Sequence, residues 1–196
     1  MQIVRRSSFT PAPWKNGGGI TYEALRFPAT GVAFRWRVSV AQIDQSGPFS
    51  DFAEYHRKMV LLRGAGLRLT FDDGGETYLR ATGDLAEFDG ARHTECALLE
   101  GACTDLNLMV AKSLKGVHAS VERLAQPRLL EPSPHTTTLV FAISGLVTLG
   151  FEGHDSARLL AWDLAVLHPN DRGRIGPAAP DESVAPLVFL ATLEDN

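Results

Sequence analysis

The sequence predicts an all-β protein, and three observations lead to this prediction. Short segments alternate apolar and polar residues with a period of two, as strands with one buried face do. Helix signals are weak, and the best candidate is a short stretch at residues 116 to 126. Residues 66 to 90 can be laid without gaps over residues 145 to 169, which indicates an internal repeat. We therefore expect two packed jelly-roll β-barrels that arose by duplication.

The first clear strand is "FRWRVSVA", at residues 34 to 41. Its apolar side chains share one face, whereas Arg37 and Ser39 share the other. Further segments have the same character, because they are rich in β-branched or aromatic residues and are bounded by Gly, Pro, Asp or Ser. These segments are residues 66–71, 104–111, 137–143, 146–151, 163–168 and 186–193.

The internal repeat matches residues that mark turns. Gly66 falls on Gly145, and the "DLAEF" that begins at Asp84 falls on the "DLAVL" that begins at Asp163. A glycine thus leads into one strand of each copy and an aspartate leads into the next, as in a unit built of hairpins. We expect two domains, residues 1 to 115 and residues 116 to 196.

The composition of the chain argues against two classes of binding partner, nucleic acids and membranes. The chain has 196 residues, a net charge of −4 and no basic block, which argues against a nucleic acid. Its apolar runs are much shorter than the roughly 18 to 20 residues that cross a bilayer, so no membrane partner is expected. A cytoplasmic location follows as the expectation. Cys96 and Cys103 lack the spacing of a zinc site and are expected to be reduced and buried.

The glycine triplet of "PWKNGGG", residues 13 to 19, does not form a phosphate loop. It has neither the spacing of a P-loop or a dinucleotide fingerprint nor the strand–helix setting that both require. Two interpretations stay open. The glycines form a tight bulge at a barrel edge, or they let the backbone approach a ligand closely at the rim of a pocket.

Strand parity supplies a second group of polar residues. In "DLNLMV", Asp105, Asn107 and Met109 alternate with apolar residues and share one face. Such polar faces, like that of Arg37 and Ser39, lie either in solvent or in the lumen of a barrel. In the lumen they need partners, because an unpaired buried charge is costly.

The repeated units, each with a strand after a glycine turn and a later Gly-Asp turn, resemble the cupin barrel. In cupins that hold a metal, the first motif carries two histidines and a glutamate, and the second motif carries a third histidine. Here residues 47 to 66 contain only His56, and residues 82 to 90 contain no histidine. His154 and His168 have no partner at ligand spacing. We therefore expect no metal and no cofactor.

Four motifs, taken in order, resemble the HutD family, also called HutD/Ves. They are "PWKNGGGITYE" (13–23), "FRWRVSVA" (34–41), "GPFSDFAEYHRKMVLLRGAGLRL" (47–69) and "DLNLMV" (105–110). The resemblance implies a bicupin without the cupin metal ligands. It also implies an association with histidine utilisation, as a modulator that binds an intermediate such as N-formylglutamate.

The resemblance also implies a ligand pocket made of residues within these motifs. Its polar positions are Lys15, Asn16, Thr21, Arg37, Ser39, Ser50, Arg57, Asp105 and Asn107, its apolar walls are Trp14, Phe49 and Met109, and Gly17 and Gly18 lie beside them. Lys and Arg donors suit a small dicarboxylate, and amide and hydroxyl groups would fix its orientation. The expected partner is therefore a small acidic metabolite.

Catalysis is not indicated by the sequence, and no catalytic residue is assigned. No serine lies in a GxSxG elbow, and the histidines have no visible pairing. Two other functional classes stay open. One is a metal-independent isomerase or lyase that uses Lys15 or His56 as acid or base, with Arg37 holding the substrate. The other is a structural role as a homodimer that pairs through edge strands.

Overall fold

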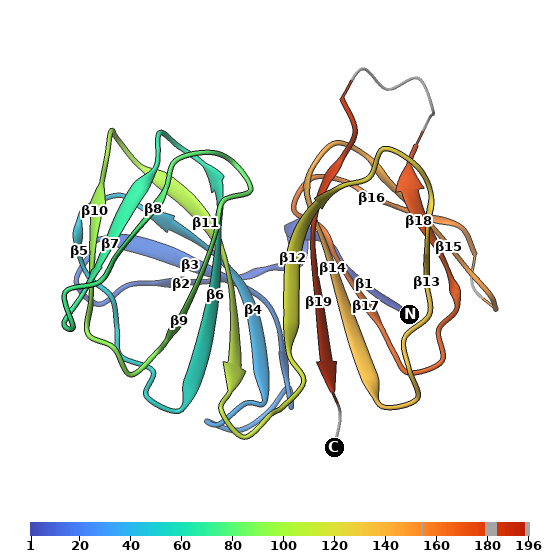
Figure 1. The fold of residues 1–196 in the computed structure, drawn as a ribbon, viewed down its shortest axis with the longest axis horizontal. Coiled ribbons are helices and arrows are strands. Elements are labelled where there is room, and N and C mark those ends of the chain that lie inside the picture. The colour runs from blue at the N-terminus through green and yellow to red at the C-terminus, as the bar shows by residue number, and fades with distance from the viewer. Residues whose placement is uncertain (154, 179–183, 195–196) are drawn as a thin grey trace. The chain divides into compact units, whose positions relative to one another are not determined.

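The computed structural model describes residues 1–153, 155–178 and 184–194. Strands dominate this part of the chain, and its one helix is the three-residue 3₁₀ turn η1 (Arg6–Ser8), so the all-β prediction is confirmed. None of its helices is long and apolar enough to cross a bilayer. The chain forms two compact units (Figure 1), which we call the N-terminal unit (Phe9–Ser113) and the C-terminal unit (Met1–Ser8 with Leu114–Asn196).

The start of the chain differs from the expected domain of residues 1 to 115. Strand β1 (Gln2–Val4) pairs with β17 (Leu164–Leu167), which places Ile3 opposite Ala165. Ile3 also packs against the core of the C-terminal unit. The first eight residues therefore belong to the C-terminal unit, because the sheet edge that accepts them is there.

The N-terminal unit is built of two sheets. The larger sheet has the strand order β2-β3-β4-β11-β6-β9, and the smaller one has the order β5-β10-β7-β8. Apolar residues from both sheets, including Leu61 and Leu69, form the core between them, and the two free cysteines are buried with them as expected. The strands are β2 (Thr10–Pro13), β3 (Gly19–Phe27), β4 (Trp36–Ile43), β5 (Gly47–Pro48), β6 (Tyr55–Arg63), β7 (Leu67–Phe71), β8 (Glu76–Leu79), β9 (Leu85–Asp89), β10 (Thr94–Leu98) and β11 (Cys103–Ala111).

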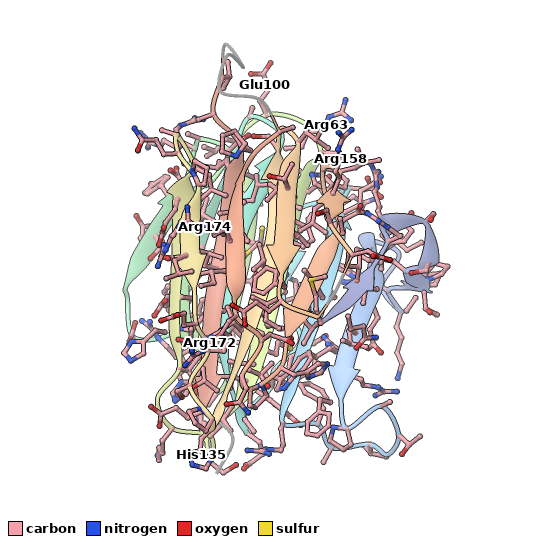
Figure 2. The ribbon with its side chains drawn as sticks, turned by 90° about the vertical axis from the view of Figure 1, so that its right-hand side faces the viewer. Arg63, Glu100, His135, Arg158, Arg172 and Arg174 are labelled. Atoms are coloured by element: carbon pink, nitrogen blue, oxygen red, sulfur yellow. The ribbon has the colours of Figure 1, made fainter. Side chains whose placement is uncertain are left out.

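The C-terminal unit also has two sheets, with the orders β1-β17-β14-β19-β12 and β13-β18-β15-β16. Period-two alternation is clear in the second sheet, where Leu159 and Ile175 are buried in the core while the arginines labelled in Figure 2, Arg158 and Arg174, are exposed. Besides β1 and β17, the strands are β12 (His118–Arg123), β13 (Arg128–Leu130), β14 (Thr136–Ser144), β15 (Val147–Phe151), β16 (Ala157–Leu159), β18 (Gly173–Pro177) and β19 (Leu187–Glu194).

The helix candidate at residues 116 to 126 is wrong, since its centre forms strand β12. This strand pairs with β19 along its whole length, from His118 opposite Thr192 to Arg123 opposite Leu187. A segment this short gains little as an isolated helix, whereas pairing with β19 satisfies its backbone groups. The unpaired edge of β19 therefore decides its conformation.

Three backbone positions with positive φ recur in the two units at one spacing of 79 residues. In order along the chain, Gly66, Gly74 and Gly83 correspond to Gly145, Gly153 and Trp162. The aspartate that follows the third position plays the same part in both units. Asp84 accepts a hydrogen bond from the backbone N–H of Ala81 (2.9 Å), and Asp163 accepts one from that of Leu160 (3.1 Å).

Candidate functional site

A pocket of about 580 Å³ opens in the N-terminal unit. All the predicted binding residues except Gly17 and Gly18 line it: Trp14, Lys15, Asn16, Thr21, Arg37, Ser39, Phe49, Ser50, Arg57, Asp105, Asn107 and Met109. The sequence prediction missed Ala12, Pro13, Glu23, Ala41, Pro48 and Phe52, which also line it. The structure thus brings together residues from four separate sequence motifs.

The register of three neighbouring strands places the central residues. Across β4 and β11, Arg37 lies opposite Met109, Ser39 opposite Asn107, and Ala41 opposite Asp105. Arg57 on β6 lies opposite Met109 from the other side. Residues that lie directly opposite each other share a face of the sheet, so strand parity directs all of them into the pocket. These polar faces therefore point into the interior of the unit and not into solvent.

The glycine triplet forms the turn of the β2–β3 hairpin. The Trp14 N–H donates to the Gly19 carbonyl (3.0 Å), and the Gly17 N–H donates to the Trp14 carbonyl (3.0 Å). Gly17 has φ +72°, and a Cβ on Gly19 would lie 2.3 Å from the carbonyl oxygen of Gln42 on β4. These two glycines serve the turn and the close approach of β4. Gly17 and Gly18 do not themselves line the pocket, whereas the predicted residues 14 to 16 beside them do.

Four polar side chains at the bottom of the pocket are buried, and we call them the polar floor: Ser39, Arg57, Asp105 and Asn107. Arg57 donates from Nη2 to Oδ1 of Asn107 (2.8 Å), and Asn107 donates from Nδ2 to Oδ1 of Asp105. Asp105 is 0% exposed and Arg57 is 6% exposed. Among the described residues, Arg57 Nε and Asp105 Oδ2 are buried without a hydrogen-bond partner.

Burial shifts the pKa values of the charged groups around the polar floor. It raises the pKa of Asp105 to about 7, and the opposing effects of Arg57 and of the hydrogen bond from Asn107 are smaller. Burial also lowers the pKa of Arg57 to about 10. It lowers the pKa of Arg37 as well, and the negative charge of Glu23 offsets part of this shift. Both arginines remain cations at neutral pH, whereas Asp105 is close to its midpoint.

Aromatic rings surround both guanidinium groups. The Arg37 guanidinium lies 5.2 Å from the ring centre of Phe34 and 5.4 Å from that of Phe52. The Arg57 guanidinium lies 5.0 Å from the rings of both Phe49 and Phe88. Such contacts hold a cation in place without neutralising it.

Two of the missed residues contribute directly to the electrostatics and walls of the pocket. Glu23 forms an ion pair with Arg26 (3.3 Å), and it lies two residues after Thr21 on β3, so strand parity could have indicated it. Phe52 lies in the loop between β5 and β6, where no periodic pattern applies. Trp14, which was among the predicted residues, donates from Nε1 to Oγ1 of Thr21 (2.8 Å).

The residues at this site do not suit a metal ion. The two guanidinium groups would repel a cation, and His56 is exposed and does not line the pocket, because it precedes Arg57 on the strand and points to the other face. The described ranges contain no group of three or more His, Cys, Asp or Glu side chains placed to hold a metal. His154 lies outside the described residues.

The solved structures that are similar to this chain fall into two groups, which differ in sequence identity. The chain is similar to a conserved Pseudomonas aeruginosa protein (TM-score 0.86, 28% identity) and to HutD from Pseudomonas fluorescens (TM-score 0.79, 27% identity), and in each case it covers at least 98% of both chains. It also matches an oxalate decarboxylase from Bacillus subtilis (TM-score 0.66, 11% identity), covering 100% of this chain and 77% of that one. The fold is therefore all-β, with structural neighbours in the cupin fold.

Comparison of sequences assigns the chain to a protein family. It is 36% identical over 172 residues to a Pseudomonas putida protein described by its position in the hutC 3′ region, covering 87% of this chain and 88% of that protein. It is 33% identical over 138 residues to protein Ves of Escherichia fergusonii, covering 70% of each chain. The HutD family model matches residues 6–183. The chain belongs to the HutD family.

Proposed function

We propose that this protein binds a small acidic metabolite in the pocket of its N-terminal unit and thereby modulates histidine utilisation. The main observation behind this proposal is that Arg57 is buried. It forms no ion pair within the part of the chain that the structure describes. A buried cation that no carboxylate contacts directly is costly, and an anionic ligand that binds it would offset that cost.

The arrangement of cations favours a dicarboxylate. Arg57 lies at the bottom of the pocket, Arg37 is less deeply buried, and Lys15 is exposed. A ligand with two carboxylates would place one against Arg57 and the other toward Arg37 or Lys15. The relatives named HutD or placed in the hutC region point to an intermediate of histidine breakdown, such as N-formylglutamate. We also propose a cytoplasmic location for this protein.

We also propose that the two units are cupin-like barrels that arose by duplication. Two observations support this: the positive-φ positions that recur 79 residues apart, and the aspartate that closes the same turn in both units. Glycine occupies the third of these positions in the N-terminal unit and Trp162 occupies it in the C-terminal unit, although a tryptophan is strained at positive φ. Descent from a common ancestor would explain a turn that is kept despite this strain.

A thermal-shift panel of urocanate, N-formylglutamate, glutamate and histidine, with and without divalent metals, tests the binding function. We expect an acidic member of the panel to raise the melting temperature, because a ligand that binds only the folded state stabilises it. Arg37→Ala should remove this gain. Arg68→Ala, which changes a half-buried arginine of the same unit outside the pocket, should retain it. Stabilisation by metals alone, with no effect of any metabolite, contradicts the proposal.

The alternative of a metal-independent enzyme rests on Lys15, which shares the pocket with Arg37. The other suggested acid or base, His56, does not line the pocket. Following each panel compound by NMR during incubation with the protein distinguishes the two functions. Conversion of a compound that is abolished by Lys15→Met favours the enzyme, and unchanged compounds favour the binding protein.

A further inference from the structure

Three polar atoms among the pocket-lining side chains are buried without a partner in the described structure. They are Nε of Arg37, Nε of Arg57 and Oδ2 of Asp105. The two Nε atoms can only donate, so they call for acceptor atoms of a ligand. Oδ2 of Asp105 accepts when the carboxyl is ionised and can donate when it is protonated. Its protonation state therefore decides which ligand atom it can meet.

Asn107 separates Asp105 from the nearest cation. Arginine has only donors, so the amide must present Oδ1 to Arg57, and this leaves Nδ2 for Asp105. Asp105 thus receives a hydrogen bond from a neutral amide where an ion pair with Arg57 would otherwise form. A fully buried carboxyl with this single bond is easily protonated.

Charged and titratable groups face Asp105 from several elements. Arg57 on β6 favours its ionised form, and Arg37 on β4 and the exposed Lys15 are further cations that line the same pocket. Glu23 on β3 opposes them and is itself paired with Arg26. Cys96 on β10 remains a neutral thiol, because burial raises its pKa to about 12. The protonation state of Asp105 is therefore a balance between its burial, which favours the neutral form, and Arg57 with the hydrogen bond from Asn107, which favour the ionised form.

A bound anion changes this balance. A carboxylate held by Arg57 brings a second negative charge next to Asp105 in a region that excludes water, and two carboxylates at such a site share one proton. We propose that the pocket takes up one proton together with a carboxylate ligand, and that Asp105 holds this proton on Oδ2 and donates it in a hydrogen bond to the ligand. This inference rests on the proposed function. The proton comes from solvent, and no covalent bond other than the new O–H is made.

The inference defines the ligand class and its regulation. The pocket would then present three donors, the Nε–H groups of Arg37 and Arg57 and the O–H group of Asp105, which suits a carboxylate and disfavours its amide analogue. Because burial already raises the pKa of Asp105 to about 7, proton uptake requires only a modest further rise near neutral pH. Above about pH 7, the affinity of the pocket for a carboxylate ligand should fall about tenfold for each pH unit.

Isothermal titration calorimetry with N-formylglutamate, in two buffers that differ in ionisation enthalpy, measures the proton uptake directly. At about pH 8 the wild type should take up close to one proton for each ligand bound. Asp105→Asn should bind without proton uptake, because its amide N–H still donates. Glu76→Gln, which removes an exposed carboxylate of the same unit outside the pocket, should leave the uptake unchanged.

The outcomes separate this inference from the function on which it rests. Binding without proton uptake, or uptake that persists in Asp105→Asn, overturns the inference and leaves the binding function intact. Absence of binding by every compound of the panel overturns both. If Asp105→Asn does not fold, carbon-13 NMR of the Asp105 carboxyl in the wild type replaces it. The pKa of this carboxyl should rise on addition of N-formylglutamate, and a pKa that stays constant or falls contradicts the inference.

Discussion

Arg57 and Asn107 lie on neighbouring strands and are joined by a buried hydrogen bond of 2.8 Å from Nη2 to Oδ1. The same Asn107 side chain donates to Asp105, so one neutral amide links a cation to an acid. This chain of contacts explains how the polar floor holds two ionisable groups apart in a protein interior. It also makes Asn107 the residue whose loss should affect the site most broadly.

Asn107→Ala should lower the free energy of unfolding by about 3 kcal/mol, because it leaves both Arg57 and Asp105 buried without their hydrogen bonds. Urea denaturation of the wild type and the variant measures this loss. Gln42→Ala serves as a control, because Gln42 is an exposed polar residue on the neighbouring strand β4. A loss for Asn107→Ala no larger than that of the control would show that the linkage contributes little.

Asp105→Asn should change how stability depends on pH. Burial raises the pKa of Asp105 from 3.8 to about 7, so between these values the folded protein binds more protons than the unfolded chain. The stabilising effect of this proton is fully present below about pH 4 and is lost as the pH rises through about 7. The stability of Asp105→Asn relative to the wild type should therefore increase across this range. Urea denaturation at a series of pH values tests this, and a constant difference would contradict it.

The three glycines of the β2–β3 turn should respond differently to replacement by alanine. Gly17→Ala should cost about 1 kcal/mol through strain at φ +72°, since the space around it is open. Gly19→Ala should cost about 2 to 3 kcal/mol, because its Cβ meets the backbone of Gln42. Gly18→Ala is the matched control, as its Cβ would make only an ordinary contact with Asn16. Equal losses at all three positions, measured by thermal unfolding, would contradict this explanation.

Ile3→Asp should loosen the C-terminal unit and spare the N-terminal unit. The substitution places a charge against the apolar core of the C-terminal unit and weakens the pairing of β1 with β17. Hydrogen exchange followed by mass spectrometry should show faster exchange in residues 138 to 141 and 164 to 167, with residues 85 to 89 unchanged. Gln2→Asp, at an exposed position on the same strand, should have little effect. Faster exchange in both units would contradict the assignment of β1.

Local sequence pattern was sufficient for the strands that alternate clearly. The segments at residues 66–71, 104–111 and 137–143 all contain strands, because period two reports one buried face directly. Pattern was not sufficient for residues 2–4 and 118–123. Both become strands through partners distant in the sequence, β17 and β19, and a local window contains no information about such partners.

The candidate site could be predicted as a set of residues but not as a network. Parity on two strands indicated Arg37, Ser39, Asp105 and Asn107, and the family motifs added the remaining predicted residues. The position of the Asn107 amide between Arg57 and Asp105 depends on side-chain conformations that no sequence pattern encodes. Phe52 was missed for a related reason, since a loop residue has no periodicity to report its direction.

The assignment of β1 to the C-terminal unit has a consequence for synthesis on the ribosome. Residues 9 to 113 contain every strand of the N-terminal unit and can fold while the rest of the chain is still being made. Strand β1 emerges before all of them, yet its partner β17 emerges only when most of the chain has been translated. Strand β1 is therefore made before the strands of the N-terminal unit but is paired only after them, and until then its apolar residues stay exposed.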